Sequence, residues 1–146
     1  MLVSRLYGMK IVQKDQKKRG YILGISCVEN EIEGYICCSE SESEFFADGD
    51  RAVVCKEFMT FEKTAKRDKR GADLRLGRAV YSEKGKYLGN LDDCTASKNK
   101  LNYALVGKKK YPFSRLILGD VIILKDEKLL AEVAAKNMLI DNLCKL

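Results

Sequence analysis

The sequence contains no histidine and no Cys-x-x-Cys motif. The lack of histidine removes the commonest general base and every Ser–His or Cys–His nucleophile pair. A metal site would have to use thiolates and carboxylates alone, and the isolated spacings of these residues give no pair of metal ligands on one turn. We therefore expect no enzyme activity, no cofactor and no metal site.

Long apolar runs are also missing. No stretch approaches the roughly 18 residues of a membrane span, and Arg5 and Lys10 interrupt the start before a signal-peptide core could form. We expect a soluble cytoplasmic protein without membrane insertion. In that reducing compartment the cysteines should be free and mostly buried, although the vicinal pair Cys37-Cys38 leaves a redox role open.

Short segments rich in Val, Ile, Tyr and Leu alternate with turn sequences such as KDQKKRG, ADGD and SEKG. The period-two pattern predicts strands at 6–12, 21–29, 34–39, 51–58, 78–81, 87–93, 101–106, 111–115 and 120–124. Their close spacing favours hairpins over helical crossovers and predicts an all-β fold of one or two small antiparallel barrels. The acidic pair Asp92-Asp93 is interpreted as a solvated strand end, because strand neighbours point to opposite faces.

The strand pattern is repeated. Gly8 and residues 9–12 match Gly77 and residues 78–81, residues 20–24 match 85–89, and residues 50–56 match 120–125. Such a diverged duplication predicts two tandem copies of one small fold. Gly20 and Gly85 are expected to close hairpins at positive φ, whereas Gly24 and Gly89 are expected at a bulge or barrel corner.

The segment LGRAVYSEKGKYLGNLDD, with RLILGDVIILK after it, resembles the PRC-barrel domain. Shared features are a glycine before the first strand, an acidic-glycine turn, a tyrosine before a second glycine, and Gly-Asp ahead of a final apolar strand. The resemblance covers residues 74–126 well and 3–56 more loosely. It implies a protein that docks on other macromolecules, as in the photosynthetic reaction centre H subunit, a ribosome maturation factor and small prokaryotic proteins.

The expected organisation is two PRC-barrel-like domains, at 1–57 and 74–126, separated by a charged linker or short helix at 58–73. Residues 127–146 are expected to form an amphipathic helix. This helix either packs on the barrels or docks on a partner, including a second copy of the chain. Its apolar stripe comprises Leu129, Leu130, Val133, Ile140 and Leu143.

Charge separates the two halves. Residues 1–57 carry eight Lys or Arg against ten Asp or Glu, a net −2, whereas residues 76–126 carry ten against five, a net +5. Lysines beside Tyr111 and Phe113 predict a basic contact surface suited to RNA, or else a solvated hairpin that resists edge association. These lysines are Lys98, Lys100, Lys108, Lys109 and Lys110.

The sequence leaves three hypotheses. The favoured one is a non-enzymatic protein-interaction or assembly adaptor without a small-molecule substrate. The second is a ribosome- or RNA-associated factor that binds through the basic second domain. The third is an enzyme or thiol-redox protein, which requires a cysteine with a lowered pKa.

Overall fold

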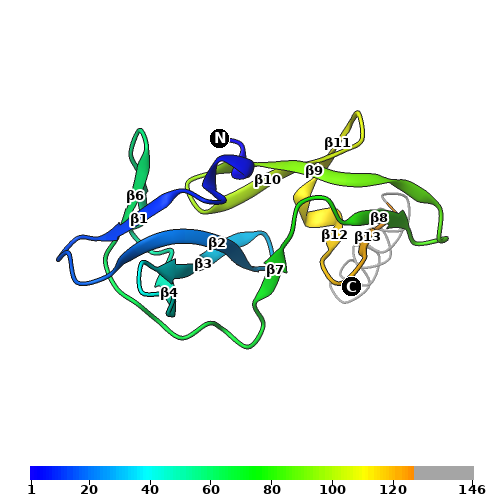
Figure 1. Cartoon of the computed structure of the whole chain (residues 1–146). Helices are drawn as coiled ribbons and strands as arrows, with labels where there is room; N and C mark the ends of the chain where they lie inside the picture. Colours follow the sequence, from blue (N-terminus) through cyan, green and yellow to red (C-terminus); the bar gives the residue numbers. More distant parts are fainter. Residues whose placement is uncertain (127–146) are drawn as a thin grey trace, which may run out of the picture.

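A computed structural model describes residues 1–126, which form thirteen strands and two short 3-10 helices. The all-β class is therefore confirmed for this part of the chain (Figure 1). The C-terminal helix expected at 127–146 lies outside the described residues. Neither helix within residues 1–126 has the length and hydrophobicity needed to cross a membrane.

Six strands make up the first copy. Strand β1 pairs antiparallel with β2 and parallel with β6, and antiparallel pairs β2–β3, β3–β4 and β5–β6 complete the set. Their bounds are β1 (Lys10–Gln13), β2 (Arg19–Val28), β3 (Glu31–Ser39), β4 (Glu44–Asp48), β5 (Val53–Val54) and β6 (Phe58–Phe61), after the helix η1 (Val3–Leu6). The segment expected as one strand at 51–58 is thus divided between β5 and β6.

The second copy repeats this pairing strand for strand. Strand β8 pairs antiparallel with β9 and parallel with β13, and the antiparallel pairs β9–β10, β10–β11 and β12–β13 follow. The duplication predicted from the sequence therefore has the same strand order and pairing in both copies. The bounds are β8 (Ala79–Ser82), β9 (Tyr87–Ser97), β10 (Lys100–Val106), β11 (Lys109–Pro112), η2 (Phe113–Arg115), β12 (Leu116–Ile117) and β13 (Ile122–Leu124).

The match between Gly8 and Gly77 is confirmed. Both have positive φ, 81° and 88°, and the amide of each donates over 2.7 Å to a carbonyl on the second strand, that of Ile22 or of Leu91. In the left-handed region, a side chain would be strained. The two glycines therefore give the chain the same backbone conformation just before the first strand of each copy.

The two other matches are wrong. Gly20 lies opposite Ile11 and Gly89 lies opposite Val80, so Gly20 corresponds to Gly89 and not to Gly85. The positive-φ counterpart of Gly85 is Gln16, because the first turn is one residue longer and a bulge in β9 restores the register. Residues 50–56 contain β5, the counterpart of β12, whereas the counterpart of β13 is β6.

The expected closed barrels are absent over residues 1–126. The hydrogen-bonded strand order is open, β12-β13-β8-β9-β10-β3-β2-β1-β6-β5, with β11, β4 and β7 attached at the side. Closure of the first copy would require β4 to pair with β5. Residues 63–65 occupy the outer edge of β4 instead, through a bridge between Ala47 and Thr64 and a 3.0 Å bond from the amide of Ala65 to the Phe46 carbonyl.

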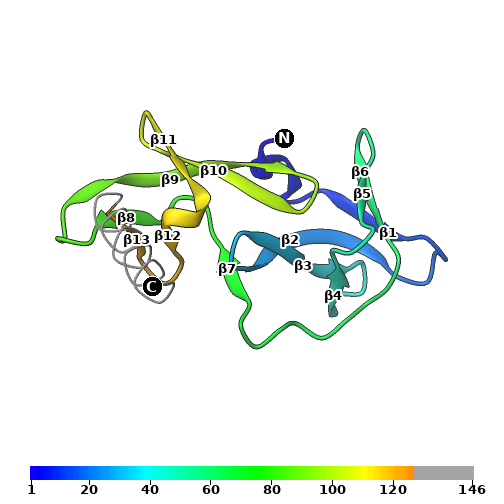
Figure 2. The same cartoon turned by 180° about the vertical axis from the view of Figure 1, so that it is seen from behind.

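The two copies exchange the segments that precede their first strands. Strand β7 (Ala72–Leu74) leads into the second copy but pairs antiparallel with β2 of the first. The start of the chain leads into the first copy but pairs with β9 of the second, through a bridge between Leu2 and Thr95. Figure 2 shows β7 beside β2, between the two copies. Residues at both ends of the expected linker 58–73 are thus strand residues.

The β2–β3 and β9–β10 hairpins also join at their tips. The amide of Ile32 donates to the Asn99 carbonyl at 2.7 Å, and the amide of Leu101 donates to the Asn30 carbonyl at 2.8 Å. Between these two bonds Glu31 is the strand partner of Lys100. The tips therefore interact reciprocally, with opposite charges across the pairing.

The core lies between the copies' strands and includes both exchanged segments. Val3 and Leu6 are fully buried at one exchange, and Leu74 is buried at the other. Corresponding strand positions are buried in both copies: Ile11 and Val80, Ile22 and Leu91, Ile32 and Leu101, Cys37 and Val106, Met59 and Ile122, and Phe61 and Leu124. Each copy thus depends on the other to bury its apolar residues.

We expect Gly20→Ala to destabilise the protein strongly. A Cβ at Gly20 would lie 2.0 Å from the carbonyl oxygen of Cys38, so strands β2 and β3 would have to separate. Overpacking of this kind lowers the free energy of unfolding by about 1–3 kcal/mol or more, measured by urea denaturation. Gly24→Ala is the control on the same strand, since its Cβ would lie 3.4 Å from Ile36 and would change stability little. Equal effects of the two substitutions would contradict this packing.

We also expect that a chain cut between Lys69 and Arg70 folds only when both fragments are present. Each fragment alone lacks a leading segment and a hairpin tip that pair with its own strands. Circular dichroism should show little cooperative unfolding for either fragment, and mixing should give a stoichiometric complex with the stability curve of a folded protein. A fragment that unfolds cooperatively by itself would disprove the mutual dependence.

Candidate binding groove at the junction of the two copies

A groove of about 640 Å³ lies where β7 and η1 approach β2. Its walls come from segments far apart in the sequence, between residues 4 and 76, and combine aliphatic side chains with three charged ones. We call it the junction groove; it is lined by Ser4, Tyr7, Leu23, Gly24, Ile25, Ile36, Glu44, Asp73, Leu74, Arg75 and Leu76. Residues this far apart in sequence share no motif, so sequence reasoning missed the site.

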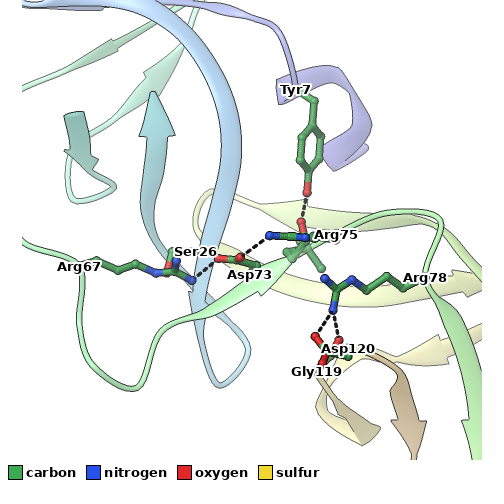
Figure 3. Close-up of polar contacts among 9 residues, drawn as sticks. Tyr7, Ser26, Arg67, Asp73, Arg75, Arg78, Gly119 and Asp120 are labelled. Carbon is green, nitrogen blue, oxygen red and sulfur yellow. Dashed lines mark hydrogen bonds and ion pairs between the residues drawn. The ribbon is translucent and has the colours of Figure 1, made fainter. Parts of the chain in front are cut away.

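A chain of polar contacts fixes the β7 side of the groove (Figure 3). Asp73 forms ion pairs with Arg67 and with Arg75, the latter at 3.1 Å. Arg67 also donates to the hydroxyl of Ser26 at 2.8 Å, which satisfies that fully buried group. Partial burial alone would raise the pKa of Asp73, but the hydrogen bonds and charges of the two arginines outweigh it and lower that pKa.

Tyr7 connects η1 to β7 because its hydroxyl donates to the carbonyl of Leu74 (Figure 3). Burial raises the pKa of Tyr7 well above its usual range, so the hydroxyl stays protonated as a donor. A smaller groove of about 270 Å³ shares Asp73 and Arg75 with the junction groove. There Arg78 donates to the Gly119 carbonyl and pairs with Asp120 at 3.5 Å.

Comparison with the second copy explains why the junction groove is open. Gly24 corresponds to Asp93, whose carboxylate accepts hydrogen bonds from the amides of Ser4 at 3.0 Å and Cys94 at 2.8 Å. This carboxylate occupies the equivalent place beside β9. In the first copy glycine leaves that place empty. Asp93 thus has a structural role, and Asp92 lies at a bulge in β9.

The predicted basic contact surface is divided by the fold. Lys98 and Lys100 lie at the β9–β10 hairpin tip, against the tip that carries Glu31. Lys108, Lys109 and Lys110 lie at the other end of β10, about 20 Å away along the strand. The three distal lysines are exposed, and Lys110 lies 3.9 Å from the ring centroid of Tyr103. The fold therefore brings together three of the five.

The other predicted site, the apolar stripe of Leu129, Leu130, Val133, Ile140 and Leu143, lies outside the described residues and stays a prediction.

Among the cysteines, Cys27, Cys37 and Cys94 are free and buried as expected, and burial raises the pKa of each to about 12. Cys38 and Cys55 are free and half-buried. The raised pKa values favour the protonated form of the three buried thiols at neutral pH.

The junction groove combines a hydrogen-bond donor, charged side chains and apolar side chains. The hydroxyl of Tyr7 donates a hydrogen bond to the backbone, and two arginines balance the charge of Asp73. The other lining side chains are mostly apolar. Within residues 1–126 no three His, Cys, Asp or Glu side chains are placed to hold a metal ion. No protein-family model and no curated protein matches the chain.

We expect Asp73→Asn to remove part of the acid sensitivity of the fold. Because the pKa of Asp73 is lowered by folding, its carboxylate stabilises the native state above its ordinary pKa of 3.8, and this contribution is lost as the pH falls through the folded pKa. At neutral pH the substitution should lower the free energy of unfolding by about 1 kcal/mol, and less near pH 2. Urea denaturation at several pH values measures the loss of unfolding free energy at neutral pH and its decrease toward pH 2.

Asp120→Asn is the control, since Asp120 also pairs with an arginine but is fully exposed. We expect it to leave stability within about 0.5 kcal/mol of the wild type at every pH. The assignment would be contradicted if both substitutions had the same pH dependence.

Proposed function

We propose that this chain is a non-enzymatic protein-interaction module of the PRC-barrel type that binds a partner protein at the junction groove. The duplicated fold serves as a rigid support for a binding surface and carries no catalytic group in this role. A cytoplasmic location, expected from the sequence, belongs to the same proposal.

One observation carries this proposal, the apolar side chain at Leu23. Leu23 projects from a bulge in β2 at the rim of the junction groove and is 55% exposed. Its counterpart in the second copy is Asp92, at the same bulge position of β9. Because one copy folds with a carboxylate there, the fold does not require leucine. An exposed leucine beside an apolar groove is typical of a docking surface.

The groove also offers partner specificity. Glu44 on one wall has no ion pair in the described chain, whereas Arg75 on the other wall is held by Asp73. A partner that inserts an apolar side chain beside Leu23 and places a basic side chain against Glu44 would match both features. The PRC-barrel resemblance supports the same class of function, because such domains dock on macromolecules.

The second candidate is RNA or ribosome association through the second copy. The supporting observation is the exposed group Lys108, Lys109 and Lys110, with Lys110 stacked on the exposed ring of Tyr103. Only three of the predicted lysines contribute, because Lys98 and Lys100 lie at the opposite end of β10. This candidate therefore ranks below the protein-interaction module.

We expect Leu23→Asp to abolish binding of a specific partner while leaving the fold intact. The variant introduces the residue type that the second copy carries, so urea stability should stay within about 0.5 kcal/mol of the wild type. Purified chain immobilised in extract of its own host should retain a partner that the variant loses. Ile117→Asp, at a half-exposed position of β12, is the control and should retain it.

A chain ending at residue 126 completes the test. Retention of the partner by this chain places the binding site in the described residues, whereas its loss points to the predicted stripe at residues 127–146. The proposed site is wrong if Leu23→Asp and wild type retain the same proteins in equal amounts.

A further inference from the structure

A row of exposed side chains crosses the outer face of the first copy. Lys10 on β1 is the strand partner of Tyr21 on β2 and of Phe58 on β6. Directly paired residues project from the same face of a sheet, and Tyr21 and Phe58 are 48% and 39% exposed. The row therefore presents one aromatic ring on each side of a lysine. Figure 2 shows the three strands side by side.

The rings are available for stacking. Across two strand spacings, Tyr21 and Phe58 lie about 9–10 Å apart, so each can take a separate planar partner. Neither ring contacts another ring or a cation within the described part of the chain. Tyr87 in the second copy differs, because its ring packs against Tyr81 at 5.6 Å.

Several cationic side chains without an ion pair lie on or beside this face. Arg19 lies two residues before Tyr21 on β2, so the two side chains project from the same face of the strand. Lys17 and Lys18 lie just before Arg19, in the exposed β1–β2 turn. Together with Lys10 these cations have no ion pair among residues 1–126. Two nearby acids are engaged, since Glu62 pairs with Lys14 and Arg51, and Asp15 accepts the amide of Lys17. Glu57, next to Phe58, is exposed and has no ion pair among residues 1–126.

The second copy shows that the fold does not require this row. Lys10 corresponds to Ala79, Tyr21 to Asn90, and Arg19 to Tyr87. Each residue occupies the same pairing position as its counterpart, although the bulge in β9 lies between the counterparts of Arg19 and Tyr21. Within residues 1–126, this row of two rings flanking a lysine thus belongs to the first copy, because the corresponding strand positions of the second copy hold no lysine and no aromatic residue.

We propose that this face binds single-stranded nucleic acid. Tyr21 and Phe58 stack on bases, and Lys10 and Arg19 contact the phosphates between and beside them. Stacking on aromatic rings along a basic surface is sequence-tolerant and needs no base-edge hydrogen bonds. The site is separate from the junction groove and does not depend on the partner protein proposed above.

The test uses the full chain and a fluorescent single-stranded oligouridine of about 12 nucleotides, with binding measured by fluorescence anisotropy. Tyr21→Ala and Phe58→Ala should each weaken binding about 5- to 150-fold. Wild-type affinity should fall steeply between about 50 and 200 mM salt, and Lys10→Gln should reduce the slope of log affinity against log salt by about 0.7.

Tyr87→Ala is the matched control, since Tyr87 is an exposed tyrosine at 55% on the second copy. It should bind as the wild type does, and a double-stranded competitor should displace the oligonucleotide poorly. Three results would overturn the proposal: no binding at low salt, equal losses in Tyr21→Ala and Tyr87→Ala, or a loss seen only when Lys108, Lys109 and Lys110 are replaced. The last result would support the second candidate function instead.

Discussion

The rest of the structure depends on the reciprocal pairing of the two hairpin tips. Two backbone bonds, from Ile32 to Asn99 and from Leu101 to Asn30, hold the copies in register. In a dimer of identical chains, the residues facing each other here would carry the same charge. A tandem chain escapes that restriction, and Glu31 faces Lys100. The opposite net charges of the two halves are thus favourable at the place where the halves meet.

The exchange of leading segments makes the two copies one folding unit. Strand β7 completes the edge of β2, and residues near the start of the chain complete the edge of β9, so each copy covers apolar side chains of the other. Exposed strand edges are sites of aggregation, and this mutual pairing covers two of them. Because small domains bury a low fraction of their surface, joining two copies around shared strands is also a route to a sufficient core.

The duplication serves as an internal comparison between structural and functional residues. Six pairs of corresponding strand positions are buried and apolar in both copies, as with Ile22 and Leu91, because both backbones enclose them in the same way. Exposed positions have diverged, and Leu23 corresponds to Asp92 and Tyr21 to Asn90. Leu23 and Tyr21, on which the two proposed surfaces depend, therefore both lie on β2 of the first copy, which the sequence resemblance covers less well.

The sequence by itself determined the all-β class, the duplication and the glycines at 8 and 77, because period-two hydrophobicity and positive-φ turns are local properties. It misplaced the match of Gly20, because a one-residue change in turn length is offset by a bulge in β9 that no hydrophobic pattern reveals. Only the tertiary structure decided that the sheet stays open, that Lys98 and Lys100 lie apart from Lys108, and that Ser4 and Leu76 line one groove. These features arise from strand pairings between distant residues, and such pairings leave no periodic signal in the chain.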